Sequence, residues 1–308
     1  MSGLKIAVLC GGRFALPAIQ QLAVEKYLCG IAIGNGDAAT VKLLDSECEK
    51  SGLPFQSFPT AKSASGLENW LEEVQPDAVF SICFPYRISE DLLTKWEGKF
   101  INFHTGPLPQ YRGPMPIFEV LRYKETETAI SVHFMNAEFD EGDLIFSEKV
   151  DIAPEDNFGT LAGKLSFCAA MSAQNMAQML EFGSMVPRQE QDENHARYFE
   201  KPEWEDTFIQ WNRMDAAEIL QLIKACNPWN QGADTVFMGN PMKIIVAHLG
   251  EERHQAKPGT ILQANEHSIS VACLDGDCIN VQVIGGSNGI VTAGQFNQLK
   301  PVVGYQFN

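Results

Sequence analysis

The sequence predicts an α/β protein: a Rossmann-like, mostly parallel sheet domain followed by a small, OB-like β-barrel domain. Two observations predict this. Apolar strand-like runs alternate with helical patterns up to residue 183, which is typical of a parallel sheet covered by helices. After residue 204, short β-like runs are separated by Gly, Asn and Asp turns. We therefore expect domains at 1–183 and 204–308, joined by a polar, proline-containing linker at 184–203.

The individual elements follow from periodicity and from their start and stop residues. Pro17 is tolerated in the first turn of a helix, and Gly52 is suited to end one. The expected helices are 16–27, 38–52, 158–182 and 216–226. The expected strands are 4–10, 28–34, 76–84, 98–104, 129–135 and 143–150 in the first domain, and 234–238, 242–249, 259–264, 268–274 and 278–284 in the second.

The net charge of −16 disfavours an extended nucleic-acid partner. Acidic residues exceed Lys and Arg by 29 to 17 in residues 1–204 and by 10 to 6 in residues 205–308, so no basic domain is hidden. No run of about 18 apolar residues and no secretion signal is present, so we expect a cytoplasmic protein without a membrane partner. The 8 cysteines include no Cys-x-x-Cys pair, which argues against structural zinc.

The pair Gly11-Gly12 follows the first strand without completing a Gly-x-Gly-x-x-Gly fingerprint. It predicts a tight strand-to-helix turn with close packing, and dinucleotide binding is the weaker alternative. No Gly-x-Ser-x-Gly nucleophile motif is present.

The stretch "INFHTGPLPQYRGPMPI" contains the candidate catalytic residues. Asn102 and His104 are two apart at the carboxyl end of a strand, so they share a face at the edge where parallel sheets bind ligands. The turn "MNAEFDEGDLI" supplies a carboxylate, from Glu138, Asp140, Glu141 or Asp143, that could hold the imidazole. With an amide as neutral oxyanion donor, this set suits attack on an acyl carbon. A structural histidine beside a charged surface turn is the alternative.

These stretches resemble motifs of the 10-formyltetrahydrofolate-dependent formyltransferases, whose members act on methionyl-tRNA or on amino sugars. "NFHTGPLPQYRGPMPI" resembles the signature Asn-x-His-x-Ser-Leu-Leu-Pro-x-x-Arg-Gly-x-x-Pro, and "KIAVLCGGRFALPAIQQL" and "MNAEFDEGDLI" resemble two further family segments. "IQWNRMDAAEILQLIKACNPW" is similar to the start of the family's C-terminal domain. The resemblance runs nearly end to end and implies a transferase of a one-carbon group that uses 10-formyltetrahydrofolate and no metal.

Residue by residue, the resemblance implies that Asn102, His104 and Asp140 are catalytic. An amine would attack the formyl carbon, Asn102 and His104 would stabilise the oxyanion, and His104, held by Asp140, would help to move a proton toward N10 of the folate. The resemblance also implies that five residues contact the folate, and we add two candidates for contact with the acceptor. The folate set is Tyr86, Arg87, Ile88, Glu138 and Phe139; the acceptor set is Phe14 and Arg112.

Two departures from the family bear on the acceptor. Gly106 replaces the signature serine, whose role must then be met by water or backbone. The basic loop of tRNA-acting members is replaced by "GNGDAATVKLLDSE". We therefore expect transfer to a small amine, such as an amino sugar nucleotide or an amino-acid-derived compound. The alternatives are a methionyl-tRNA formyltransferase, a hydrolase of 10-formyltetrahydrofolate and a non-catalytic binding protein; a homodimer is possible.

Overall fold

The computed structural model describes residues 3–287, 289–299 and 302–308, and it divides into two compact units. Unit 1 comprises the chain up to Pro116, together with Glu127–Asp151 and Ala162–Phe199. Unit 2 comprises Ile117–Thr126, Ile152–Leu161 and the chain from Glu200 onward. The two units are therefore not separated at a single point of the chain, because Ile117–Thr126 and Ile152–Leu161 belong to the same unit as the C-terminal part.

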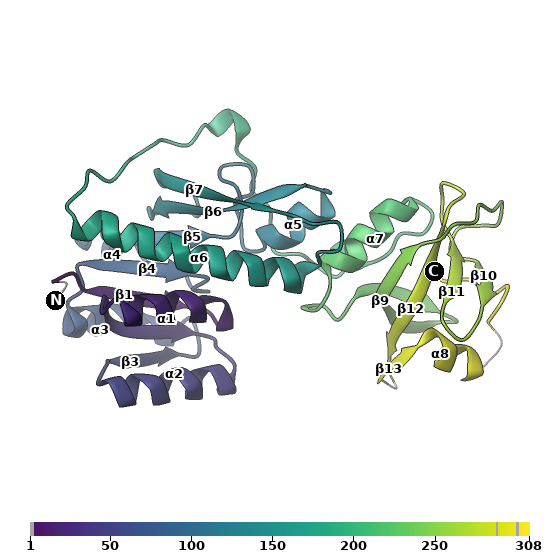
Figure 1. Cartoon of the computed structure of the whole chain (residues 1–308), viewed down its shortest axis with the longest axis horizontal. Helices are drawn as coiled ribbons and strands as arrows, with labels where there is room; N and C mark the ends of the chain where they lie inside the picture. Colours follow the sequence, from purple (N-terminus) through teal and green to yellow (C-terminus); the bar gives the residue numbers. More distant parts are fainter. Residues whose placement is uncertain (1–2, 288, 300–301) are drawn as a thin grey trace. The chain divides into compact units, whose positions relative to one another are not determined.

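Unit 1 is built on a seven-stranded sheet in the order β3-β2-β1-β4-β5-β6-β7 among the described residues (Figure 1). Its first five strands are parallel, and β6 and β7 are antiparallel to their neighbours. The strands are β1 (Ile6–Cys10), β2 (Leu28–Gly34), β3 (Phe55–Phe58), β4 (Ala78–Ile82), β5 (Phe100–His104), β6 (Glu127–Phe134) and β7 (Leu144–Asp151). The predicted α/β class with a mostly parallel sheet is confirmed.

Helices cover both faces of this sheet. In Figure 1, α1 and α6 lie on the near face, whereas α3 and α4 lie on the far face. On the far face, Trp70, Leu71 and Trp96 pack into a buried apolar cluster with Leu9 and Phe100. The helices of the chain are α1 (Leu16–Val24), α2 (Ala38–Ser51), α3 (Leu67–Val74), α4 (Glu90–Lys95), α5 (Pro116–Arg122), α6 (Phe158–Glu181), α7 (Ala216–Ala225) and α8 (Ala293–Leu299).

Local signals account for several of these boundaries. The Asp37 side chain accepts from the amides of Ala39 and Thr40 and so begins α2, and Gly52, at φ 65°, ends it. A Cβ on Gly11 would lie 2.0 Å from the carbonyl oxygen of Cys83, so the turn after β1 abuts the loop after β4. The prediction of close packing at this glycine is confirmed.

Much of the segment predicted as a linker packs within unit 1. Gln189 exchanges backbone hydrogen bonds of 2.8 and 2.9 Å with Leu144, at the start of β7. Further on, the amide of Arg112 donates to the carbonyl of Arg197, and the amide of Phe199 donates to the carbonyl of Arg112. We call residues 189–199 the strap, because backbone hydrogen bonds join its first residue to Leu144 and its last residues to Arg112.

Unit 2 contains an antiparallel sheet in the order β10-β11-β12-β9-β8, with β13 paired to β12. Its strands are β8 (Ala233–Phe237), β9 (Asn240–Leu249), β10 (Ile261–Ala264), β11 (Ile269–Ala272), β12 (Cys278–Gly286) and β13 (Gly289–Thr292). Gln306 pairs with Thr260 and Phe307 pairs with Phe237, so the C-terminal residues join the two outer strands in a barrel-like closure. The predicted small β domain is confirmed.

No helix among the described residues is long and apolar enough to cross a membrane.

Candidate active site

The end of β5 presents Asn102 and His104 on one side of the sheet. In the antiparallel pairing with β6, Asn102 stands opposite His133 and His104 stands opposite Ser131. The Asn102 side chain is half-buried, whereas only 6% of the His104 side chain is exposed. Strand alternation thus aims the amide and the imidazole the same way, as the two-residue spacing predicted.

The turn between β6 and β7 brings the carboxylate of Asp140 to this pair. Its Oδ1 lies 3.4 Å from Nδ1 of His104 and 3.5 Å from Nδ2 of Asn102, and its Oδ2 accepts from the amide of Gly113 at 3.0 Å. Asp140 has φ 59°, a left-handed conformation that is uncommon for a residue with a side chain. Of the acidic residues in this turn, Asp140 is the one that meets the imidazole among the described contacts.

Both ring nitrogens of His104 face oxygen acceptors. Nε2 lies 2.6 Å from the backbone carbonyl of Tyr111, and because a carbonyl only accepts, Nε2–H must donate. Burial alone would lower the pKa of His104, but the carboxylate of Asp140 outweighs it, and the pKa is raised. For Asp140, burial acts to raise the pKa, but His104 and His133 hold it well below its usual range. Both shifts favour an imidazolium beside a carboxylate.

His133 is a member of this cluster that the sequence reasoning missed. Its Nδ1 lies 2.9 Å from the carbonyl oxygen of Phe134, so Nδ1–H donates there and Nε2 faces Asn102. That Nε2 lies 3.1 Å from Nδ2 of Asn102, whose amide group must then point its nitrogen toward His133 and Asp140. The antiparallel register of β5 and β6 creates this contact, and periodicity does not encode that register.

The residues expected to contact the folate lie in two loops that are joined to each other. Nη2 of Arg87 donates to the carbonyl of Ala137 at 2.6 Å, and its guanidinium lies 5.4 Å from the ring centre of Phe139. Tyr86 donates from its hydroxyl to the carbonyl of Phe58 at 3.0 Å, and the Ile88 side chain is buried in the core. Glu138 and Phe139 are exposed. Arg87 therefore connects the loop after β4 to the acidic turn.

Of the two candidates for acceptor contact, Phe14 is half-buried, and its carbonyl accepts from the hydroxyl of Ser166 at 2.6 Å. The expectation that Arg112 contacts the acceptor stays a prediction. Its side chain is 3% exposed, and its guanidinium is engaged by Gln191, Glu141 and Glu193. A buried guanidinium with these partners holds protein segments together instead of offering its donors to an acceptor.

The loop that contains Gly106 is held by a hydroxyl of the neighbouring strand. Oγ of Ser131 donates to the carbonyl of Gly106 at 2.8 Å and accepts from the amide of Leu108 at 3.1 Å. A Cβ on Gly106 would lie 2.6 Å from Cβ of Pro116, so this loop packs too tightly for a side chain there. The expectation that water or backbone takes the role of the serine stays a prediction.

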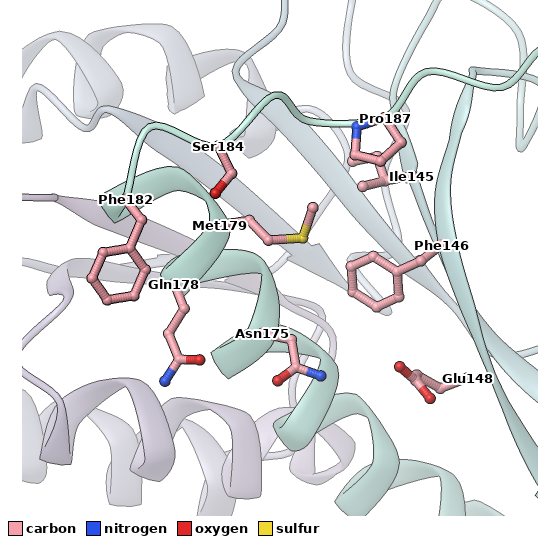
Figure 2. Close-up of a pocket in the computed structure, with 9 residues that line it drawn as sticks. All are labelled: Ile145, Phe146, Glu148, Asn175, Gln178, Met179, Phe182, Ser184 and Pro187. Atoms are coloured by element: carbon pink, nitrogen blue, oxygen red, sulfur yellow. The ribbon is translucent and has the colours of Figure 1, made fainter.

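Two other features of the described residues bear on ligands. No group of three or more His, Cys, Asp or Glu side chains among them is placed to hold a metal ion. Figure 2 shows an open groove between β7 and the second half of α6, where two phenylalanines and Met179 lie among polar side chains. Its lining is Ile145, Phe146, Glu148, Asn175, Gln178, Met179, Phe182, Ser184 and Pro187. None of the three candidate catalytic side chains lines it.

Comparison with known proteins finds matches over both parts of the chain. The family described as Formyl transferase matches residues 39–173, and the family described as Formyl transferase, C-terminal domain, matches residues 202–298. The chain is 28% identical over 299 residues to the methionyl-tRNA formyltransferase of Moorella thermoacetica. The aligned stretch covers 94% of each protein.

Two solved structures share the fold. One is the sugar 3N-formyl transferase WlaRD, with a TM-score of 0.71 at 16% identity over 91% of this chain and 97% of that one. The other is an N-formyltransferase of Helicobacter canadensis, solved with folinic acid and dTDP-3-aminofucose, with a TM-score of 0.69 at 16% identity over 91% and 99% of the two chains.

Proposed function

Since the chain belongs to the formyl transferase family, with both its N-terminal and its C-terminal domains, we propose that it transfers a formyl group from 10-formyltetrahydrofolate to a primary amine. The observation that carries this proposal is the convergence of Asn102, His104 and Asp140 at the end of β5. Family membership supports formyl-tetrahydrofolate as the donor.

The reaction forms one bond from the amine nitrogen to the formyl carbon and breaks the bond from that carbon to N10 of the folate. The amine loses a proton and N10 gains one. Attack places negative charge on the formyl oxygen, and a nearby amide N–H and imidazolium would stabilise it. One N–H of Asn102 is bonded to His133, and the other faces Asp140 at a long 3.5 Å, so the second is the donor available to the oxyanion.

His104 supplies positive charge beside that oxyanion. Its Nε2–H is bonded to the carbonyl of Tyr111, so donation of this proton to N10 requires the ring to exchange Tyr111 for substrate, and only then can the ring accept the proton that the amine loses. Asp140 keeps the imidazole protonated until then. His104 can therefore stabilise the oxyanion by its charge without any movement of the ring. To transfer a proton, its ring must first leave the carbonyl of Tyr111.

For the acceptor, we place the α-amino group of methionyl-tRNA first. The relative from Moorella thermoacetica bears that activity in its name and matches nearly the full length of both chains, which supports the tRNA reading over the small amine expected from the sequence.

A small amine is the second candidate, and a specific observation favours it. Residues 35–37 alone connect β2 to α2, and Asp37 in this connection pairs with Arg13 at 3.6 Å between Oδ1 and Nη2. Asp37 thereby partly neutralises the charge of Arg13, whereas a nucleic-acid partner would need positive charge there. The net charge of the whole chain, −16, is also unfavourable for such a partner. The Helicobacter canadensis structure was solved with an amino sugar nucleotide.

One assay separates these candidates. Purified protein is incubated with 10-formyltetrahydrofolate and either methionyl-tRNA or a panel of amino sugar nucleotides, and the formylated product is quantified by mass spectrometry. Methionyl-tRNA should be formylated in a salt-sensitive manner, and preference for a sugar would select the second candidate. Formate release without any acceptor would indicate the hydrolase. If the wild-type protein shows no turnover, and His104→Ala behaves in the same way, the result would indicate a binding protein.

A further inference from the structure

The strap carries a side chain that joins the two loops on either side of the candidate active site. Gln191 is 7% exposed, although it lies in a polar segment that the sequence marks as a linker. Its Nε2 donates to the carbonyl of Asp140 at 2.7 Å and to the carbonyl of Gly142 at 2.8 Å. Its Oε1 accepts from Nε and Nη2 of Arg112 at 3.2 and 3.0 Å.

Every hydrogen-bonding position of this amide is therefore used. Two N–H groups meet two carbonyl oxygens, and the amide oxygen meets a guanidinium, which only donates. Turning the amide over would set its oxygen against two carbonyls and its nitrogen against a cation, so a single orientation is possible. A buried amide with all partners present is a rigid connection.

Arg112 at the other end of this connection is itself held firmly. Its guanidinium makes a two-pronged contact with Glu193, with Nη2–Oε1 at 2.6 Å and Nη1–Oε2 at 3.0 Å, and Nη1 lies 3.2 Å from Oε1 of Glu141. Its backbone is paired with the strap on both sides of Tyr198. The signature loop, the strap and the acidic turn are thus one bonded network within unit 1.

This network holds the backbone of Asp140. Its backbone has φ 59°, which costs free energy for a residue with a side chain, so neighbouring contacts must hold it. Gln191 bonds the carbonyl of Asp140 itself, and the amide of Gly113 bonds the Asp140 carboxylate. The two contacts fix the direction in which the carboxylate leaves the turn, toward Nδ1 of His104.

We propose that Gln191 is a positioning residue for formyl transfer, which holds the backbone of the Asp140 turn and so aims the Asp140 carboxylate at His104. This inference rests on the proposed function. Gln191 touches neither substrate nor the reacting atoms in this account; it acts through Asp140.

Two variants separate its contacts. Gln191→Leu removes donors and acceptor together without a change of charge. Gln191→Glu keeps an oxygen for Arg112 but sets a second oxygen against the carbonyls of Asp140 and Gly142. The matched control is Gln189→Leu, two residues earlier in the strap, where the side chain is exposed.

The kinetic readout is kcat at saturating folate and acceptor, together with KM for the folate. Misplacing a catalytic group by about 1 Å costs about 100-fold in rate, so both Gln191 variants should lose kcat on that order while KM for the folate changes much less and Gln189→Leu keeps wild-type values. Circular dichroism and thermal unfolding establish that each variant is folded. If Gln191→Glu retains wild-type kcat, the donors to the turn are not needed and the proposal fails.

A second readout does not depend on turnover. NMR titration of the His104 ring in wild type and Gln191→Leu should show a lower pKa in the variant, because the carboxylate that raises it is no longer aimed at the ring; the charged and titratable groups facing this cluster are Asp140 and His133. An unchanged titration in a folded variant would overturn the positioning role. Absence of formyl transfer in wild type, with the NMR difference present, would instead count against the proposed function.

Discussion

Nδ2 of Asn102 lies 3.1 Å from Nε2 of His133, and this contact decides which way the Asn102 amide points. The same Nδ2 faces Oδ1 of Asp140 at 3.5 Å, a carboxylate oxygen that only accepts, and Nδ1–H of His133 is bonded to the carbonyl of Phe134. The half-buried Asn102 and the buried His133, from antiparallel strands, thereby present an N–H donor where an oxyanion would form.

Replacing His133 should reduce catalysis through Asn102. In His133→Leu the amide loses its acceptor and can turn its oxygen toward the reaction centre, so kcat should fall by about 100-fold, the cost of one oxyanion donor. His133→Gln, which keeps an acceptor, should lose less. Steady-state kinetics on both variants checks this, with exposed His267→Leu as the control. Wild-type kcat in His133→Leu would contradict it.

The raised pKa of His104 should depend on Asp140. Asp140→Asn leaves a buried imidazole without a counter-charge, and burial then lowers the pKa of His104. NMR titration of the histidine rings in wild type and Asp140→Asn measures the difference. A control at Asp45→Asn, on the exposed side of α2, should leave the titration unchanged.

The same pair should make stability depend on pH. The folded pKa of His104 is raised, so its contribution is fully present below its unfolded value of about 6.5 and is lost as pH rises through the folded pKa. The folded pKa of Asp140 is lowered, so its contribution is present above about 3.9 and is lost as pH falls. The free energy of unfolding of wild type should exceed that of Asp140→Asn most between about pH 4 and 6.5, as denaturant titrations at several pH values would measure. If wild type and Asp140→Asn differ in free energy of unfolding by the same amount from about pH 3 to 9, this linkage is ruled out.

Restoring the family's serine at position 106 should destabilise the protein. A Cβ on Gly106 meets Pro116 at 2.6 Å and Tyr111 at 3.2 Å, and overpacking of this kind costs about 1–3 kcal/mol. Gly163→Ser on α6 is the matched control, because nothing lies within 4 Å of its added Cβ. Thermal and denaturant unfolding of the two variants should differ clearly in midpoint, and equal midpoints would show that the loop relaxes.

Arg87 should affect folate binding more than the chemical step. Arg87→Leu removes the bond to the carbonyl of Ala137 and frees the two loops expected to contact the folate. A lost hydrogen bond from a charged group is worth about 1.5–3 kcal/mol, so KM for 10-formyltetrahydrofolate should rise by about tenfold or more while kcat changes little. Lys62→Leu, at an exposed position, is the control. A fall in kcat with unchanged KM would assign Arg87 to the chemistry instead.

The sequence by itself determined the features that local rules encode. Alternation of apolar runs and helical patterns predicted β1, β2, β4 to β7 and α6, and the two-residue spacing placed Asn102 and His104 on one face of a strand. Short elements such as β3 and α4 were missed, because four to six residues carry too little periodicity to stand out from loops; α3 was missed although its apolar residues recur at helical spacing.

Only the tertiary structure decided the surroundings of the candidate site. Arg112 was a candidate for contact with the acceptor, but its guanidinium is buried and donates to Gln191, 79 residues further along the chain. His133 looked like one more strand residue until the register with β5 set it against Asn102. Spacing along a chain fixes which side chains share a face of one element, whereas contacts between distant segments depend on how those segments pair in space.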